Sequence, residues 1–358
     1  MLKFLFQRSI AGALVLLGVI VIIFLLLNVI PVSAEQLSVG QNTDEATLQA
    51  TKEKLRLNHS PIVRFWFYLS DLSPVSIQSH TDKKAPLSLL SGNYNYINII
   101  KGKEKSLVLK QPYFGRSYQT DKPVLQILAK KILPTLILAI TAITLASLIG
   151  IAFGLIAALN HNKWIDNFLL SISVLGISIP SYFSALLLAI FFGYYLGNYT
   201  HLNITGSLFD INDYGEHFIN WKNLILPTIA LGIRPVAIIL QLTRNSMLDV
   251  LREDYIRTAK SKGLKNSVVI VKHALRNALN PVVTSITGWF AALLAGAFFV
   301  EYIFDFKGLG YETVYALTMF DFPVIMGAVL LIASFFVLVN IIVDVLYTKL
   351  DPRIVLNE

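Results

Sequence analysis

Arg234 lies deep inside an apolar stretch of this sequence and is followed by Pro235. A charged side chain in the middle of such a segment is costly unless it faces water, a counter-ion or a substrate. One hypothesis is that Arg234 lines a path for a solute and attracts an acidic group, such as the carboxylate of a peptide. The alternative is a structural residue that pairs with another helix or lies near a kinked, wetted end.

Catalytic and metal-binding patterns are missing from the sequence. It has no GxxxxGK[ST] phosphate loop, no HExxH and no GxSxG. Its six histidines are scattered without metal-ligand spacing, and it has no cysteine. We therefore predict no catalytic residue, no metal site and no cofactor held by this chain. ATP cannot bind here through a phosphate loop.

A polar, basic stretch between apolar regions, Asp254–Pro281, has the pattern of a helix, a tight turn and a second helix. Apolar residues recur at spacings of three and four on both sides of Gly263. Gly263 can adopt the left-handed conformation that ends a helix, and Asn266 or Ser267 can cap the next one. Such a turn is suited to dock into a groove on a soluble partner, with basic flanks for steering. The simpler interpretation is a surface loop that only fixes topology.

The composition is that of a polytopic membrane protein. Of the 358 residues, 55% are hydrophobic and 15% are charged, and the mean hydropathy is +0.62; a soluble protein has about a quarter charged residues. The net charge of +8 resides in loops, so we expect no nucleic acid partner. Apolar runs of about 20 residues can cross the hydrocarbon layer. They predict six transmembrane helices, at residues 10–30, 132–159, 167–196, 224–242, 282–303 and 324–346.

Small residues and prolines refine these predicted helices. Pro134 suits the first turn of the second helix. Gly150 and Gly154 form a small-xxx-small pair that allows another helix to approach closely. Pro180 predicts a kink in the third helix.

Charge between the helices predicts their orientation. The loop at 244–281 carries eight basic and three acidic residues, which is typical of the cytoplasmic side. The loop at 301–323 carries four acidic residues and one lysine, as expected outside. Six spans with both termini in the cytoplasm agree with the short loops. The predicted fold is therefore all-α.

The sequence divides into four predicted parts. Residues 1–30 hold the first transmembrane helix, 31–131 form an extracytoplasmic segment, 132–347 form the core, and 348–358 are a cytoplasmic tail. Within the outer segment, residues 45–57 and 61–72 have the pattern of short amphipathic helices, and residues 80–110 have no clear period and are predicted as a loop.

Several stretches, taken together, resemble a known family. Arg257–Leu264, followed by Lys272–Pro281, is similar to the cytoplasmic EAA-type loop of ABC importer permeases. It resembles in particular the first, B-type permease subunit of the dipeptide, oligopeptide and nickel importers. The resemblance covers nearly the whole chain and includes Thr243–Leu248, Gly296–Phe304, Gly308–Gly310, Phe114–Ser117 with Pro123-Val124, and Asp351–Arg353.

The resemblance implies a type I ABC importer-like fold in the bacterial inner membrane. The implied partners are a second, similar permease, two ATPase subunits that use the ATP, an external binding protein, a peptide substrate and lipid. It also implies that Ala259, Gly263 and Leu264 enter a groove of the ATPase, with Arg257 and Lys262 flanking. As a further hypothesis we place Arg234, Gln241 and Pro180 on the translocation path.

This sequence departs from the family pattern at three places. Pro31–Ala34 stands where the family usually has Pro-Gly-Asp-Pro, residues 80–110 resemble an insertion, and Arg234-Pro235 is unusual for the fourth span. Two other classes of protein remain as alternatives. A stand-alone channel or secondary carrier would transport without ATP, and a membrane-anchored enzyme or binding module would show activity in the excised outer segment.

Overall fold

The computed structural model describes residues 2–29, 49, 52–53, 56, 58–81, 87–88, 95–211 and 214–350. The Pro31–Ala34 motif, most of the predicted helix at 45–57, most of the tail and part of the segment 80–110 lie outside these residues. By its contacts the chain divides into two units. Unit 1 comprises residues 1–13, 131–314 and 332–358, and unit 2 comprises residues 14–130 and 315–331.

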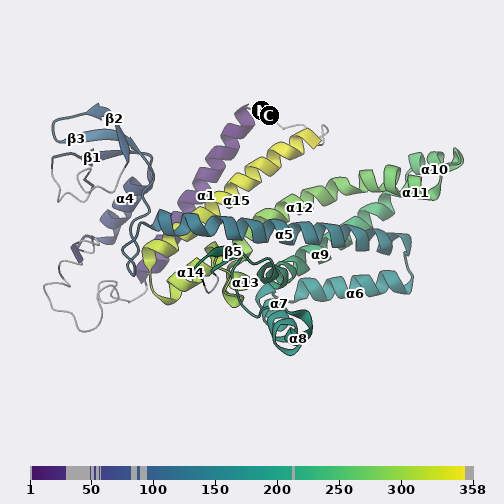
Figure 1. Ribbon diagram of the computed structural model, residues 1–358. Helices are drawn as coiled ribbons and strands as arrows, with labels where there is room; N and C mark the ends of the chain where they lie inside the picture. The colour runs from purple at the N-terminus through teal and green to yellow at the C-terminus, as the bar shows by residue number, and fades with distance from the viewer. Residues whose placement is uncertain are drawn as a thin grey trace. The chain divides into compact units, whose positions relative to one another are not determined.

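Helices dominate the described residues (Figure 1). In chain order they are α1 (Leu2–Val29), α4 (Pro61–Leu72), α5 (Val124–Leu159), α6 (Trp164–Ser178), α7 (Ser181–Leu188), the π-helix η2 (Ala189–Tyr195), α8 (Gly197–Thr200), α9 (Lys222–Val250), α10 (Asp254–Ser261), α11 (Asn266–Val268), the π-helix η3 (Val269–Leu275), α12 (Arg276–Gly296), α13 (Phe298–Ile303), α14 (Leu309–Thr318) and α15 (Phe322–Leu350). Among the described residues, five helical segments are long and apolar enough to cross a membrane. The pair α6 and α7–η2, bent by 104°, makes a sixth if it is counted as one span.

The prediction of an all-α fold is wrong in unit 2, where three strands form an antiparallel sheet in the order β1-β3-β2. The strands are β1 (Val75–Ser79), β2 (Tyr96–Lys101) and β3 (Lys105–Lys110). Two of them lie in the segment 80–110, which was predicted as a loop. β1 reads VSIQS, an alternation of aliphatic and polar residues that favours a strand with two different faces. Two short strands in unit 1, β4 (Phe209–Ile211) and β5 (His217–Ile219), also pair antiparallel.

Several predicted helix ends are wrong. α5 begins at Val124, so Pro134 lies in the helix interior rather than in the first turn. α9 continues to Val250, beyond the predicted end at 242. The fifth predicted helix is not separate from the turn before it, because one candidate span runs from Asn266 to Gly296 and passes Pro281. Such prolines are tolerated in membrane helices because neighbouring groups can satisfy the freed carbonyl.

The core of unit 1 is built around α9. The predicted close approach at the glycine pair of α5 is confirmed: a Cβ on Gly150 would lie 2.8 Å from Ile239 Cβ, and one on Gly154 would lie 2.6 Å from both the Leu240 carbonyl oxygen and Thr243 Cβ. These distances are well inside van der Waals contact, so α5 and α9 meet where α5 has no side chains. α6 and α7 pack on α9 as well, as does α12.

Candidate functional site

The turn between α10 and α11 lies at one end of the long helices α9 and α12, and α13 lies at the other end of α12 (Figure 1). Gly263 has a φ of +75°, the left-handed conformation predicted to end the first helix. Its neighbours Lys262 and Leu264 are both exposed. The second helix begins without a side-chain cap, so the predicted capping by Asn266 or Ser267 is wrong.

Beneath the turn lies a group of buried small and aliphatic side chains, which we call the turn cluster. From α10, Ile256 is fully buried and Ala259 is 7% exposed. These two residues are one turn apart and so share a face of the helix. The other buried members are Ala158 of α5, Met247 of α9, Val269 and Ala274 of η3 and Ala278 of α12.

The turn cluster includes Ala259, one of the residues for which the resemblance implies contact with a partner. The resemblance implies that its side chain enters a groove on a partner, but in the structure Ala259 packs against the protein's own helices. The exposed side of the turn consists of Arg257, Lys262, Gly263 and Leu264. Those four residues are accessible to a partner, and Ala259 supports them from below.

A buried ion pair joins α9 to the start of α6. The Arg244 guanidinium donates from Nε and Nη2 to the two oxygens of Asp166, at 2.5 and 2.7 Å. Asp166 is fully buried, and the Arg244 side chain is 13% exposed. The Asn162 N–H donates to the same carboxylate at 2.9 Å, and His161 Nδ1 lies 3.3 Å from it. Because two parallel N–H···O bonds fix both position and orientation, the ends of these helices are held together.

The turn is also tied to α12. Asn277 Nδ2 donates to the Tyr255 hydroxyl of α10 at 2.8 Å, and the turn cluster includes residues of α5, α9, η3 and α12. Close-packed interiors have low compressibility and transmit strain. A force on the exposed side of the turn therefore moves the adjoining helix ends rather than the turn alone.

The residues predicted to line a solute path have different surroundings. Pro180 lies at the break between α6 and α7, where a 104° bend replaces the predicted kink. Gln241 of α9 donates to Ser173 Oγ of α6 at 2.9 Å, so it joins two helices. Arg234 is exposed, and its guanidinium has no hydrogen bond or ion pair with any described residue. Arg234 and Gln241 are seven residues apart, so they lie on one side of α9, about 10 Å apart along its axis.

A second buried carboxylate, Glu301, fixes the connection from α13 to α14 near α5. Thr135 Oγ1 of α5 donates to Glu301 Oε1 at 2.7 Å, and the Tyr311 N–H donates to Oε2 at 3.0 Å. Thr135 Oγ1 also accepts the Leu309 N–H at 2.8 Å. A Cβ on Gly308 would overlap both the carboxylate and the Thr135 hydroxyl. The absence of a side chain at Gly308 is therefore what lets the loop close over Glu301.

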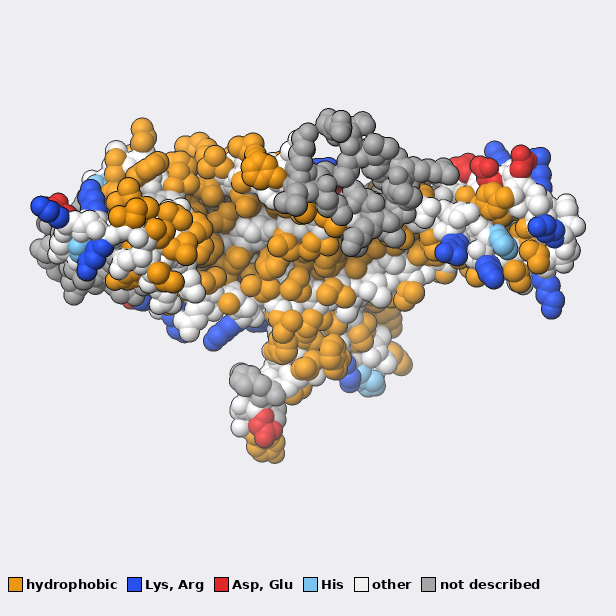
Figure 2. Space-filling view, turned by 90° about the horizontal axis from the view of Figure 1, so that it is seen from above, with side chains coloured by type: hydrophobic (Ala, Val, Ile, Leu, Met, Phe, Trp, Pro, Cys, Tyr) orange, Lys and Arg blue, Asp and Glu red, His pale blue; other side chains and the backbone are white. Residues whose placement is uncertain are grey.

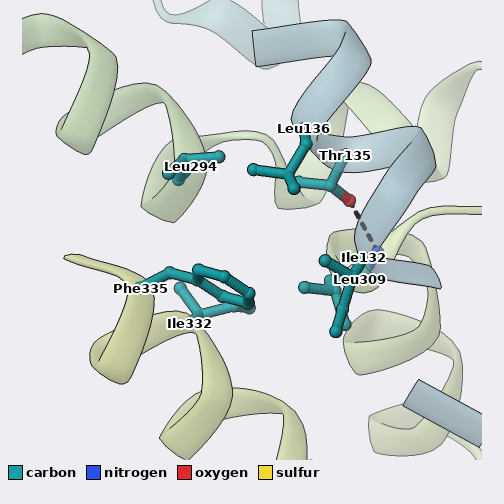
Figure 3. Close-up of a pocket in the computed structure, with 7 residues that line it drawn as sticks. All are labelled: Ile132, Thr135, Leu136, Leu294, Leu309, Ile332 and Phe335. Atoms are coloured by element: carbon teal, nitrogen blue, oxygen red, sulfur yellow. Dashed lines mark hydrogen bonds between the residues drawn. The ribbon is translucent and has the colours of Figure 1, made fainter. Parts of the chain in front are cut away.

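A small apolar cavity lies beside Thr135 (Figure 3). Its volume is about 10 Å³, and its lining residues are Ile132, Thr135, Leu136, Leu294, Leu309, Ile332 and Phe335. The Thr135 hydroxyl is engaged with the Leu309 N–H, as the dashed line in Figure 3 shows. A space this small holds at most one water, and a water needs two or more polar partners. The cavity is therefore a packing defect and not a solute site.

The two buried carboxylates were not singled out from the sequence. Glu301 counted only as one of the acidic residues in an outer loop, and Asp166 fell between the second and third predicted helices. The useful signals were a carboxylate directly beside an apolar run and, for Glu301, the glycine at 308. Neither signal identifies the residue that binds the carboxylate, because Thr135 is 166 positions from Glu301 and Arg244 is 78 positions from Asp166.

Comparisons with known proteins cover almost the whole chain. The family model "Binding-protein-dependent transport system inner membrane component" matches residues 150–356, and a model for the N-terminal part of such components matches residues 1–91. The glutathione transport system permease protein GsiC, in Salmonella typhimurium and in Escherichia coli (strain K12), is 32% identical over 354 residues, which is 99% of each chain. The dipeptide transport system permease protein DppB of Alkalihalophilus pseudofirmus is 33% identical over 368 residues, again 99% of each chain. Among solved structures, a chain of an amino acid ABC transporter is 16% identical, with a TM-score of 0.44, and covers 63% of this chain and 94% of its own.

Proposed function

The chain belongs to the family of binding-protein-dependent transport system inner membrane components, and on that premise we propose that it carries short peptides. It is a permease subunit of an ABC importer in the bacterial inner membrane. The similar proteins named above are permeases of glutathione and dipeptide transport systems. Glutathione and dipeptides are both short peptides with a free carboxylate, which is the substrate chemistry proposed for this chain.

In this proposal the chain forms half of the translocation path, with six spans and both termini in the cytoplasm. A second, similar permease forms the other half, two ATPase subunits bind and hydrolyse ATP, and an external binding protein delivers the peptide to the side of residues 31–131. The eight basic residues of the loop 244–281 support its cytoplasmic side. The missing phosphate loop supports ATP use by a separate subunit.

The observation that carries the mechanism is the turn cluster. An ATPase that closes on ATP would push on the exposed side of the α10–α11 turn, at Lys262, Gly263 and Leu264. Ile256 and Ala259 would pass this movement to α5, α9 and α12, whose residues belong to the same buried cluster. The pair of Asp166 and Arg244 would keep α6 and α9 moving together. The path would then open alternately to the two sides of the membrane.

Arg234 is the residue proposed to meet the peptide. It lies in a helix apolar enough to cross a membrane, is exposed, and has no partner among the described residues. A cation there is costly unless it faces water or an opposite charge, and a water-filled path between two permeases supplies both. Gln241 lies on the same side of α9, and Pro180 marks the break at which α6 and α7 can change their angle.

The test is uptake by the assembled importer in proteoliposomes, with a labelled dipeptide and labelled glutathione as probes. A hydrogen bond to a charged group contributes about 1.5–3 kcal/mol, so Arg234→Gln should lower uptake at limiting substrate by about 10-fold or more. Arg234→Lys, which keeps the charge, is the matched control and should retain most of the uptake. Normal uptake by Arg234→Gln would contradict the assignment, as would loss of permease pairing in that variant.

A further inference from the structure

The sheet of unit 2 presents an apolar face to its surroundings. The cross-strand register aligns six aliphatic residues of β1, β3 and β2 on one face in two rows: Val75, Leu109 and Ile97, and Ile77, Leu107 and Ile100. We call these six residues the aliphatic face. All but Leu107 are between 46% and 70% exposed.

On the opposite face of the same sheet, the buried residues of β1 and β3 are polar except for Val108, which is fully buried, and Asn98 of β2 is exposed. Ser76, Gln78 and Ser106 are at most 7% exposed, and Lys110 is 4% exposed. Lys110 Nζ donates to the Asp71 carbonyl oxygen at 2.5 Å, and burial lowers the pKa of its amine. A half-exposed antiparallel sheet in water has the reverse arrangement, with its apolar face on the core. Contiguous exposed apolar surface of this kind marks an interaction site.

The path of the chain brings this sheet to the membrane surface. Phe24 belongs to the candidate span Leu5–Leu27, and its ring centroid lies 5.0 Å from that of Phe65 and 6.5 Å from that of Tyr68, both on α4. Phe24 is three residues, or about 4.5 Å, from the end of that span. α4 therefore lies at the depth of the interface between hydrocarbon and headgroups. β1 starts only three residues after α4 ends, a reach of about 10 Å.

The charges and side-chain types around the face also fit a lipid surface. Lys101, Lys103 and Lys105 at the β2–β3 connection are all exposed, with Glu104 as the acidic residue among them. Lys105 pairs with Ser79 and so lies on the side of the aliphatic face. Trp66 of α4 is 67% exposed, and tryptophan is enriched at membrane interfaces. Figure 2 shows hydrophobic side chains gathered over the region of the sheet, with Lys and Arg side chains at their margin.

We propose that the aliphatic face lies in the interfacial layer of the lipid bilayer, with the lysines of the β2–β3 connection on anionic headgroups. Lysine stems can cover apolar surface while the ammonium groups reach the phosphates. Apolar burial and attraction to anionic lipid then act together, as they do for interfacial helices. This part of the outer segment is a platform on the membrane, and it fixes where a substrate-delivering partner can approach.

The test uses the full chain, which has no cysteine, so that one introduced cysteine reports one position. Ile97→Cys and Asn98→Cys place an NBD fluorophore on adjacent, exposed residues of β2 that point to opposite faces. The protein is placed in nanodiscs of phosphatidylethanolamine and phosphatidylglycerol that contain lipid with a doxyl quencher near the carbonyl. Because successive strand residues alternate in direction, quenching at position 97 should be about three times that at position 98 or more.

Equal quenching at the two positions would overturn the proposal. So would a blue-shifted but unquenched label at position 97, which would mean that protein covers the face. The charges are tested by Lys103→Glu with Lys105→Glu, which should reduce quenching at position 97 when phosphatidylglycerol is present and not in neutral nanodiscs. No reduction would overturn the headgroup assignment. Uptake by the assembled importer is a separate readout, so failure of this proposal is distinct from failure of the transport proposal.

Discussion

Arg244→Met should destabilise unit 1 more than the change of any exposed ion pair. The substitution keeps much of the apolar stem and removes the guanidinium that bonds Asp166 at 2.5 and 2.7 Å. Asp166 is fully buried and keeps the Asn162 N–H as a donor, but it loses its bidentate counter-ion. Breaking a buried pair in this way costs about 3–5 kcal/mol. At about 2–4 °C per kcal/mol for 150–250 residues, the apparent melting temperature should fall by roughly 6–20 °C.

The assay is a thermal scan in detergent followed by fluorescence-detected size exclusion. The matched control is Arg257→Met, because Arg257 pairs with Asp254 at 3.4 Å while their side chains are 75% and 94% exposed. Exposed pairs contribute little, so this variant should melt like the unmodified chain. Asp166→Asn combined with Arg244→Met should recover part of the loss, since no charge is left buried. A loss of stability for Arg244→Met no larger than that for Arg257→Met would refute the reasoning. So would a double variant whose loss equals the sum of the losses measured for Arg244→Met and Asp166→Asn alone.

Three other outcomes follow from the packing. Gly308→Ala should destabilise the protein by about 1–3 kcal/mol through overpacking against Glu301. Gly288→Ala should be neutral or stabilising by up to about 1 kcal/mol, because an added Cβ at this helical position meets no atom within 4 Å. Thermal scans compare the two variants, and equal shifts of the melting temperature would contradict the prediction. Gly154→Val should separate α5 from α9 and lower the yield of folded protein by size exclusion, while Gly18→Val, with nothing within 4 Å, should not. Asn277→Ala should leave ATPase binding intact and reduce the coupling of ATP hydrolysis to uptake, because it removes the bond to Tyr255; unchanged coupling would show that this bond transmits nothing.

Local features of the structure could be predicted well from the sequence. The bounds of α4 match the predicted Pro61–Leu72, where a proline suits the first turn of an amphipathic segment. Gly263 adopts the predicted left-handed turn, and Gly150 and Gly154 mark the predicted close contact. Each of these depends on one residue type and on interactions within a few residues or at one helix face.

Features that depend on distant partners were not predicted. Helical periodicity placed Ala259 on one face of its helix, but it did not say whether that face meets a partner subunit or the protein's own helices. The Asp166–Arg244 pair joins the start of α6 to α9, at positions outside the predicted spans that are polar for other reasons, so composition alone does not pair them. Strands β2 and β3 were taken for a loop, because the aliphatic run Leu107–Leu109 and the irregular register between Asn98 and Ile100 interrupt the alternation of apolar and polar residues. Pro180 predicted a change of direction but not its 104° size, which neighbouring helices determine.

The central claim is that the exposed side of the α10–α11 turn receives the movement of an ATPase subunit. Photo-crosslinking from benzoylphenylalanine, in the assembled importer, tests it most directly. The residue is placed at Leu264, which is 41% exposed, or at Tyr199 of α8, which is 83% exposed. Tyr199 lies between the third and fourth predicted spans, on the side of the membrane expected to be opposite to the loop 244–281. The account predicts a crosslink to the ATPase subunit from position 264 and none from position 199. A crosslink to that subunit from position 199 would contradict the account, and so would the absence of a crosslink from both positions.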